Sequence, residues 1–101
     1  MWRQGDVLID AVEEIPAGAK RRKGAKLVSG DATGSAHKIK DPSEARIFDG
    51  PGWEREMFVE VTADSAVIVH PEHNQIVLAQ GLYRVWLQRE FSDFGPRSVI
   101  D

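Results

Sequence analysis

The apolar residues of this chain come in short runs, and Gly, Pro, Asp or Ser soon interrupts each run. Typical runs are Val7–Ile9, Ala66–Val69 and Ile76–Leu78. Apolar residues never keep a helical spacing over roughly ten residues, whereas strand-length segments bounded by Gly and Pro recur throughout. This pattern predicts an all-β fold, a small antiparallel β-barrel or sandwich of about six to eight short strands.

The length of 101 residues corresponds to a single domain with one compact core. We expect the β domain to cover residues 1–91, with a basic loop at 17–26 and a flexible or partner-bound tail at 92–101. No apolar run approaches the roughly 20 residues of a membrane span, and no apolar signal region follows Met1, which favours a cytoplasmic protein.

Two of the expected strands carry a clear alternation. Residues 56–62 place Met57, Val59 and Val61 on one face, and a turn is expected at 63–65. Residues 81–91 form the longest expected strand, in which Tyr83 and Val85 share a face. These alternations favour strands with one face on the core and one on solvent.

Charge is distributed unevenly along the chain. The overall net charge is −3. Residues 20–40 contain seven basic residues and one acid, a net of +6, and the remainder has six basic and fifteen acidic residues, a net of −9. The basic side chains are candidates for binding nucleic acid or another anion, or for a solvated loop: Lys20, Arg21, Arg22, Lys23, Lys26, Lys38 and Lys40.

The chain has three histidines and no cysteine, so a thiolate metal site and a thiol nucleophile are excluded. His70 and His73 flank a Pro-Glu pair in one expected turn, and His37 follows a Gly-rich stretch. If these turns meet, then His37, His70, His73 and Glu72 are candidate ligands of a divalent metal. The alternative is a polar hairpin turn whose histidines bond to the backbone.

Two tryptophans stand out from the apolar pattern. Trp86 falls on the polar face of its expected strand beside Arg84, and Trp53 follows the Gly-Pro-Gly break at 50–52. An amphipathic indole in such a place either packs on the rim of the core or contacts a partner. Trp53, Arg84 and Trp86 are therefore candidates for a partner surface.

Four stretches resemble a group of short, uncharacterised bacterial proteins: QGDVLI at 4–9, GDATGSAHKI at 30–39, HPEH at 70–73 and GLYRVWLQREF at 81–91. The resemblance implies a compact bacterial domain without assigning an activity. The second stretch is also similar to the first metal motif of cupins, which has two histidines one residue apart. Only His37 matches, because Ser35 occupies the first position.

The small size and the absence of an assembled catalytic set favour a non-enzymatic binding or accessory module that docks on a protein or ribonucleoprotein partner. One alternative is a protein that contacts RNA or DNA through the basic residues at 20–26. Another is a metal-dependent, cupin-like enzyme that uses His37, His70 and His73. An exposed edge strand would also allow two copies of the chain to pair as a homo-oligomer.

Overall fold

A computed structural model describes residues 1–29, 36–51, 56–87, 89–92 and 95–98. Apart from one short 3₁₀ helix, the elements in these ranges are strands. In chain order they are β1 (Trp2–Gln4), β2 (Val7–Val12), β3 (Lys20–Arg22), β4 (Lys26–Ser29), β5 (Ala36–Ile39), η1 (Pro42–Glu44), β6 (Ala45–Asp49), β7 (Glu56–His70), β8 (His73–Leu87), β9 (Arg89–Ser92) and β10 (Gly95–Ser98). The chain is therefore an all-β protein, as its sequence predicts.

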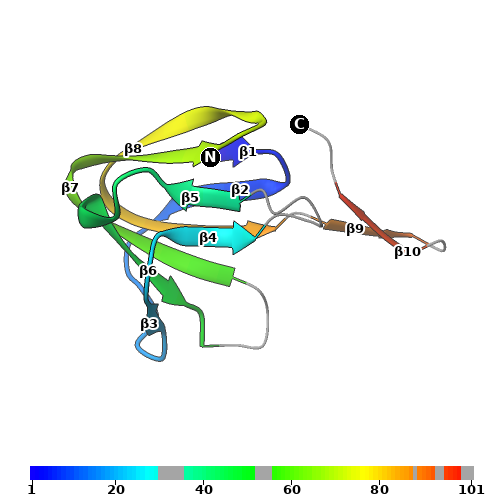
Figure 1. Cartoon of the computed structure of the whole chain (residues 1–101). Coiled ribbons are helices and arrows are strands. Elements are labelled where there is room, and N and C mark those ends of the chain that lie inside the picture. Colours follow the sequence, from blue (N-terminus) through cyan, green and yellow to red (C-terminus); the bar gives the residue numbers. More distant parts are fainter. Residues whose placement is uncertain (30–35, 52–55, 88, 93–94, 99–101) are drawn as a thin grey trace.

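Eight strands form one antiparallel sheet built around the long β7–β8 hairpin (Figure 1). The main path of the sheet runs β1-β2-β8-β7-β5-β4, and a branch leads from β7 through β6 to β3. Along its length β7 thus pairs with β6 near its start and with β5 near its end. Strands β3 and β4 are the outermost strands of these two branches.

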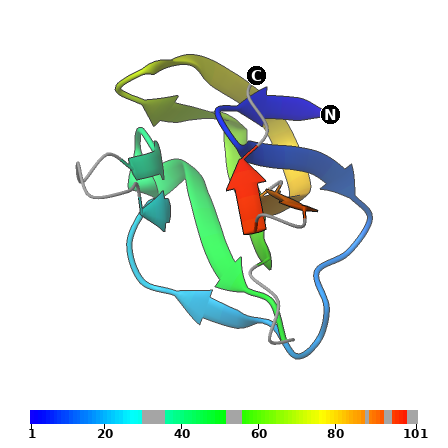
Figure 2. The same ribbon diagram turned by 90° about the vertical axis from the view of Figure 1, so that its right-hand side faces the viewer.

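The sheet curls into a half-barrel, which Figure 2 shows nearly end-on. The side chain of Gln4 on β1 reaches the backbone of β7, although β2 and β8 lie between these strands in the sheet. Trp2 meets Tyr83 of β8 edge to face, with ring centroids 5.6 Å apart. The curl buries one face of the sheet on itself, so the chain needs no second layer.

The core lies on the concave face and consists mostly of Val, Ile and Leu side chains from β2 and β5–β8, joined by Leu27 of β4. The alternation predicted for 56–62, and for the part of 81–91 that lies in β8, is confirmed, because Val59 and Val85 are fully buried. Phe58, which the alternation places on the opposite face, is also buried, so the start of β7 is covered on both sides. Within the described residues, no helix has the length and apolar character needed to span a membrane.

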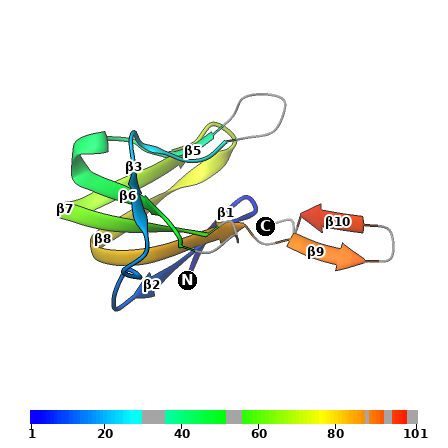
Figure 3. The same cartoon turned by 90° about the horizontal axis from the view of Figure 1, so that it is seen from below.

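Three segments differ from the sequence-based expectation. The turn expected at 63–65 is instead a shift in register inside β7, because the β7–β8 pairing continues on both sides of it. The basic loop expected at 17–26 contains strand β3, since Lys20–Arg22 pair with Ile47–Asp49 of β6. The expected tail contains β10, which pairs with β9 in a separate two-stranded sheet beside the main one (Figure 3).

Replacing a core residue on β6, the strand that connects β7 to β3, tests this packing. Ile47 of β6 is 0% exposed. We expect Ile47→Ala to lower the free energy of unfolding by about 2–5 kcal/mol, because it removes buried methyl groups and leaves a cavity. Val77→Thr, at a side chain that is 54% exposed, should change it by less than about 0.5 kcal/mol. Denaturant unfolding of both variants measures the difference, and equal losses would contradict the assigned core.

Candidate functional site

The three histidines lie in one row across three neighbouring strands. On β5 and β7, Lys38 pairs with Val69, and continuing this antiparallel register by one residue places His37 beside His70. On β7 and β8, His70 pairs with His73. Residues that pair across antiparallel strands project from the same face, so the three imidazoles are neighbours. We call His37, His70 and His73 the histidine row.

The rings of the histidine row are in close contact. Their centroids are 4.3 Å apart for His37 and His70, 4.7 Å for His70 and His73, and 6.1 Å for His37 and His73. His37 is 4% exposed, whereas His70 and His73 are half-buried. Since His37 shares the inner face of β5 with buried Ile39, the row continues the apolar core to one end of the sheet.

Gln4 closes this end of the sheet with a side chain that is 1% exposed. Its Nε2 donates to the backbone oxygens of Ile68, at 3.1 Å, and Asn74, at 2.8 Å. Its Oε1 accepts a hydrogen bond from Nδ1 of His37 at 2.8 Å. One amide therefore connects β1 to β5, β7 and β8, and all of its buried polar atoms have partners.

These bonds determine which ring nitrogens carry protons. Two backbone oxygens take the Nε2 hydrogens of Gln4, so its Oε1 faces His37 and Nδ1 of His37 is the donor. In His70 the assignment is reversed, because Nδ1 accepts the backbone N–H of Glu72 at 3.0 Å and Nε2 keeps the proton.

The β1–β2 turn packs against the third ring. Gly5 in this turn has φ +62°, and a Cβ added there would lie 2.7 Å from Nε2 of His73. Only a glycine fits both the backbone angle and the approach of the ring without a displacement. The sequence marks Gly5 as a turn residue, but nothing in it indicates this contact.

Three of the stretches that carry the sequence resemblance meet at the histidine row. Gln4 and Gly5 come from the first, His37 from the second, and His70 and His73 from the third. Residues of strands that are distant in sequence are thereby brought together at one end of the sheet. Sequence reasoning found the histidines and missed Gln4, because an isolated glutamine before a turn carries no signal of burial.

The predicted metal ligands are brought together in part. His37, His70 and His73 are adjacent, but the side chain of Glu72 is exposed and only its backbone N–H contacts the row. In the described part of the chain, no three His, Asp or Glu side chains have their ligating atoms arranged to hold a metal ion. The bond from Glu72 to Nδ1 of His70 is one physical reason, since it occupies a ligating nitrogen.

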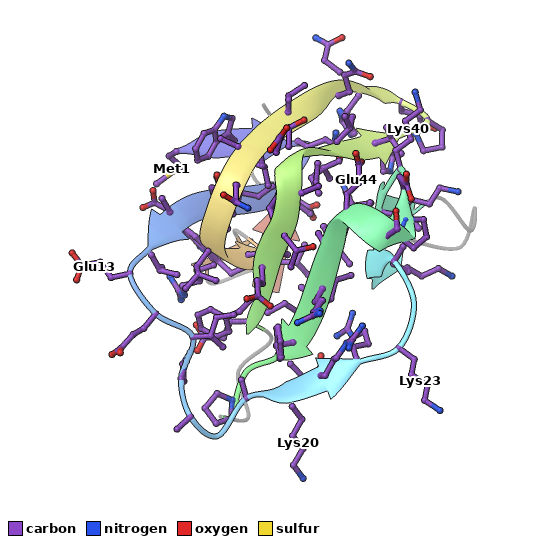
Figure 4. The ribbon with its side chains drawn as sticks, turned by 90° about the vertical axis from the view of Figure 1, so that its left-hand side faces the viewer. Met1, Glu13, Lys20, Lys23, Lys40 and Glu44 are labelled. Carbon is purple, nitrogen blue, oxygen red and sulfur yellow. The ribbon has the colours of Figure 1, made fainter. Side chains whose placement is uncertain are left out.

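A second candidate site is the cationic edge, formed by exposed basic residues on β3, β4 and β5 and in the segments that follow β3 and β5. Its members are Lys20, Arg21, Lys23, Lys26, Lys38 and Lys40. Lys26 on β4 pairs with Lys38 on β5, so two positive side chains project from the same face of an outer hairpin. In Figure 4, Lys23 and Lys40 lie toward one side of the molecule, where Glu44 is close to Lys40, while Lys20 lies at the bottom and Glu13 on the opposite side.

Arg22, the remaining predicted cation, is half-buried and connects strands. Its guanidinium donates to the backbone oxygens of Lys26, at 3.1 Å, and Leu27, at 2.7 Å, and forms an ion pair with Asp49 on β6. It therefore joins β3 to β4 and β6. At the other end of the edge, hydrogen bonds from the side chain and backbone of Ser43 lower the pKa of the exposed Asp41 carboxyl, which keeps an anion beside Lys40.

Two members of the predicted aromatic surface pack on each other. The guanidinium carbon of Arg84 lies 4.4 Å from the centre of the Trp86 ring, and its Nε donates to Glu56 Oε2 at 2.6 Å. Both side chains are half-buried on the face opposite Val85, which is the face that the sequence predicts for Trp86. Trp53 lies outside the described residues.

Comparison with protein families gives a match to a domain of unknown function, DUF8820, over residues 3–88. The chain belongs to the DUF8820 family. The DUF8820 domain thus includes Gln4, the histidine row and the cationic edge, and it ends just after β8. Comparisons with curated proteins and with solved structures gave no match.

Removing the Gln4 amide tests its role at this end of the sheet. We expect Gln4→Leu to lower the free energy of unfolding by at least about 2 kcal/mol, because each buried polar group left without a partner costs roughly 1–3 kcal/mol. Gln80 is the matched control, since its Nε2 also donates to a backbone oxygen, Thr62 O at 3.0 Å, but in an exposed position. Gln80→Leu should cost less than about 0.5 kcal/mol. Equal effects in denaturant unfolding would argue against a special role for Gln4.

A pair of glycine variants tests the contact with His73. Gly5→Ala and Gly24→Ala both place a Cβ at a positive φ, which costs about 1–2 kcal/mol. At Gly24 the added Cβ meets nothing within 4 Å, whereas at Gly5 it meets His73. We therefore expect Gly5→Ala, and not Gly24→Ala, to shift the ring signals of His73 in NMR spectra. Unchanged His73 signals in folded Gly5→Ala would show that the turn does not position this ring.

Proposed function

We propose that the chain is a small non-enzymatic binding module, which docks through the cationic edge on nucleic acid, free or within a ribonucleoprotein. The observation that carries this proposal is the pairing of Lys26 with Lys38 on adjacent strands. Like charges directly opposite each other in a sheet destabilise it, and an anion that bridges them removes the repulsion. Such a module would work in the cytoplasm.

The charges around the cationic edge support this function. Among the described residues, none of its six members forms an ion pair, although Arg22, Arg46 and Arg84 all do. The rest of the chain outside 20–40 is strongly acidic. A polyanion would therefore be attracted to this edge and repelled by the rest of the surface, which gives binding a defined orientation.

The composition of the edge indicates which part of a nucleic acid it contacts. Its six members are five lysines and one arginine, and half-buried Phe48 of β6 is the pairing partner of Arg21. Lysine and arginine side chains bind phosphates, whereas sequence-tolerant binding of single-stranded bases usually depends on aromatic stacking. We therefore assign contacts to the phosphate backbone, which makes the expected binding dependent on salt and independent of sequence.

Fluorescence anisotropy with labelled RNA and DNA oligonucleotides tests the proposal. With up to six phosphate contacts, log K should fall with log[salt] with a slope between about −3 and −5. Lys26→Ala/Lys38→Ala should reduce the magnitude of this slope by about 2 and weaken binding to all sequences alike. Arg46→Ala is the matched control, because Glu60 already pairs with this arginine at 3.5 Å, and it should leave both values nearly unchanged.

Two results would contradict the proposal. One is the absence of salt-dependent binding by the wild-type chain. The lysines would then serve only to prevent strands of other molecules from pairing with the edge of the sheet. The other is equal weakening by the double variant and by Arg46→Ala, which would indicate a response to net charge alone.

A further inference from the structure

Building on the proposed function, we infer that the nucleic acid bound at the cationic edge is single-stranded, and that its unpaired bases stack on the outer face of the sheet beside this edge. The starting observation is a row of paired residues that crosses four neighbouring strands. Arg21 of the cationic edge pairs with Phe48 on β6. Phe48 pairs in turn with Phe58 on β7, and Phe58 with Arg84 on β8. We call Phe48, Phe58 and Arg84 the stacking row.

The stacking row lies on the outer face of the sheet. Residues that pair across antiparallel strands project from the same face, and neighbours along a strand project from opposite faces. Ile47 and Val59, which adjoin Phe48 and Phe58 in the chain, are fully buried in the core. The row therefore points away from the core, on the same side of the sheet as Lys38 of the cationic edge.

The two ends of the stacking row keep surface in contact with solvent. Phe58 in the middle is 4% exposed, whereas Phe48 and Arg84 are half-buried. Arg84 is also held in a fixed orientation, because its Nε donates to Glu56 Oε2 at 2.6 Å and its guanidinium carbon lies 4.4 Å from the centre of the Trp86 ring. Glu56 and Trp86 thus act as positioning residues for the guanidinium plane.

A phenyl ring and a guanidinium plane are both groups that bind unpaired bases. Bases stack on aromatic side chains and on arginine planes in a sequence-tolerant way, because every base has a π-face. In a duplex these faces are stacked on neighbouring base pairs, and reaching them costs the energy of unstacking. Other four-stranded RNA-binding sheets stack two or three bases. The stacking row with Arg21 also spans four strands, and its two half-buried members provide places for two bases.

The charges around the stacking row allow a polyanion to cross it. Glu56 forms an ion pair with Arg84 at 2.6 Å. Glu60, the next outward-facing acid on β7, forms one with Arg46 at 3.5 Å. Both carboxylates are therefore compensated by an arginine, which weakens their repulsion of phosphates. On the far side of the row, Asp10 of β2 is the pairing partner of Arg84, so we expect the bound strand to end at β8.

Fluorescence anisotropy of the full chain with labelled oligo(dT), and with a DNA duplex of equal length, tests the stacking row. Phe48→Leu removes the ring and keeps an apolar side chain, so it should weaken binding of oligo(dT) about fivefold to a hundredfold. Binding of the duplex should stay within about twofold of the wild type. The salt slope should not change for either probe, since no phosphate contact is lost. Phe48→Tyr keeps a ring and should bind oligo(dT) within about twofold of the wild type.

Leu82→Ala is the matched control, because Leu82 is a half-buried apolar residue on the same face of β8 and has no ring. It should leave the binding of both probes nearly unchanged, and circular dichroism checks that each variant is folded.

Stacking is disproved if folded Phe48→Leu binds oligo(dT) as tightly as the wild type, or if it loses affinity for both probes equally. The proposed function would survive either result, provided that Lys26→Ala/Lys38→Ala still lowers the salt slope. A wild-type dimer in sedimentation that Phe48→Leu converts to a monomer would instead assign the stacking row to a second copy of the chain. The absence of salt-dependent binding to both probes would overturn the stacking row and the proposed function together.

Discussion

A single buried amide determines how this sheet is closed at the end that carries the histidines. Gln4 makes three hydrogen bonds, to Ile68, Asn74 and His37, from a position almost fully removed from solvent. A buried amide without partners would be costly, so β1 must lie where all three partners are in reach. The position of the β1–β2 turn, and with it the contact of Gly5 with His73, depends on this requirement.

The two candidate sites lie on opposite faces of the same short strand. In β5, His37 and Ile39 point into the half-barrel, and Lys38 points outward on the other face. The two-residue period of a strand is the cause, since neighbouring residues must face opposite sides. The histidine row and the part of the cationic edge on β5 therefore face opposite sides of the sheet, although their residues are adjacent in sequence.

The sequence predicted the fold class well because strand periodicity and turn residues are local signals. The alternations at 56–62 and 81–91 identify buried Val59 and Val85 without knowledge of their partners. The turn expected at 63–65 was wrong because a register shift lets β7 continue past Ala63–Ser65, and only the pairing with β8 reveals this. Strand β3 was missed for a similar reason, since Lys20–Arg22 is extended by its partner β6 and has no apolar alternation of its own.

The candidate sites were predictable only as lists of residue types. That His70 and His73 are close follows from their shared turn, but the proximity of His37 depends on the pairing of β5 with β7, which no local pattern encodes. The burial of Gln4 and the use of Arg22 as a link between strands likewise depend on contacts with distant segments. Hydrophobic patterning shows which face of a strand is buried. To predict a site, one must also know which residues of other strands lie beside it.

The contribution of Gln4 and His37 to the stability of the fold does not explain why these two polar side chains are buried. In the described residues these are the two buried side chains classed as polar or charged, and they are hydrogen-bonded to each other. A buried polar pair contributes little net stability, and well-packed apolar residues often replace one without loss. The core between β2 and β8 shows that this chain can fill its interior with Val, Ile and Leu. The hydrogen bond instead fixes the orientation of the His37 ring at this end of the sheet, as a fully satisfied buried polar network does.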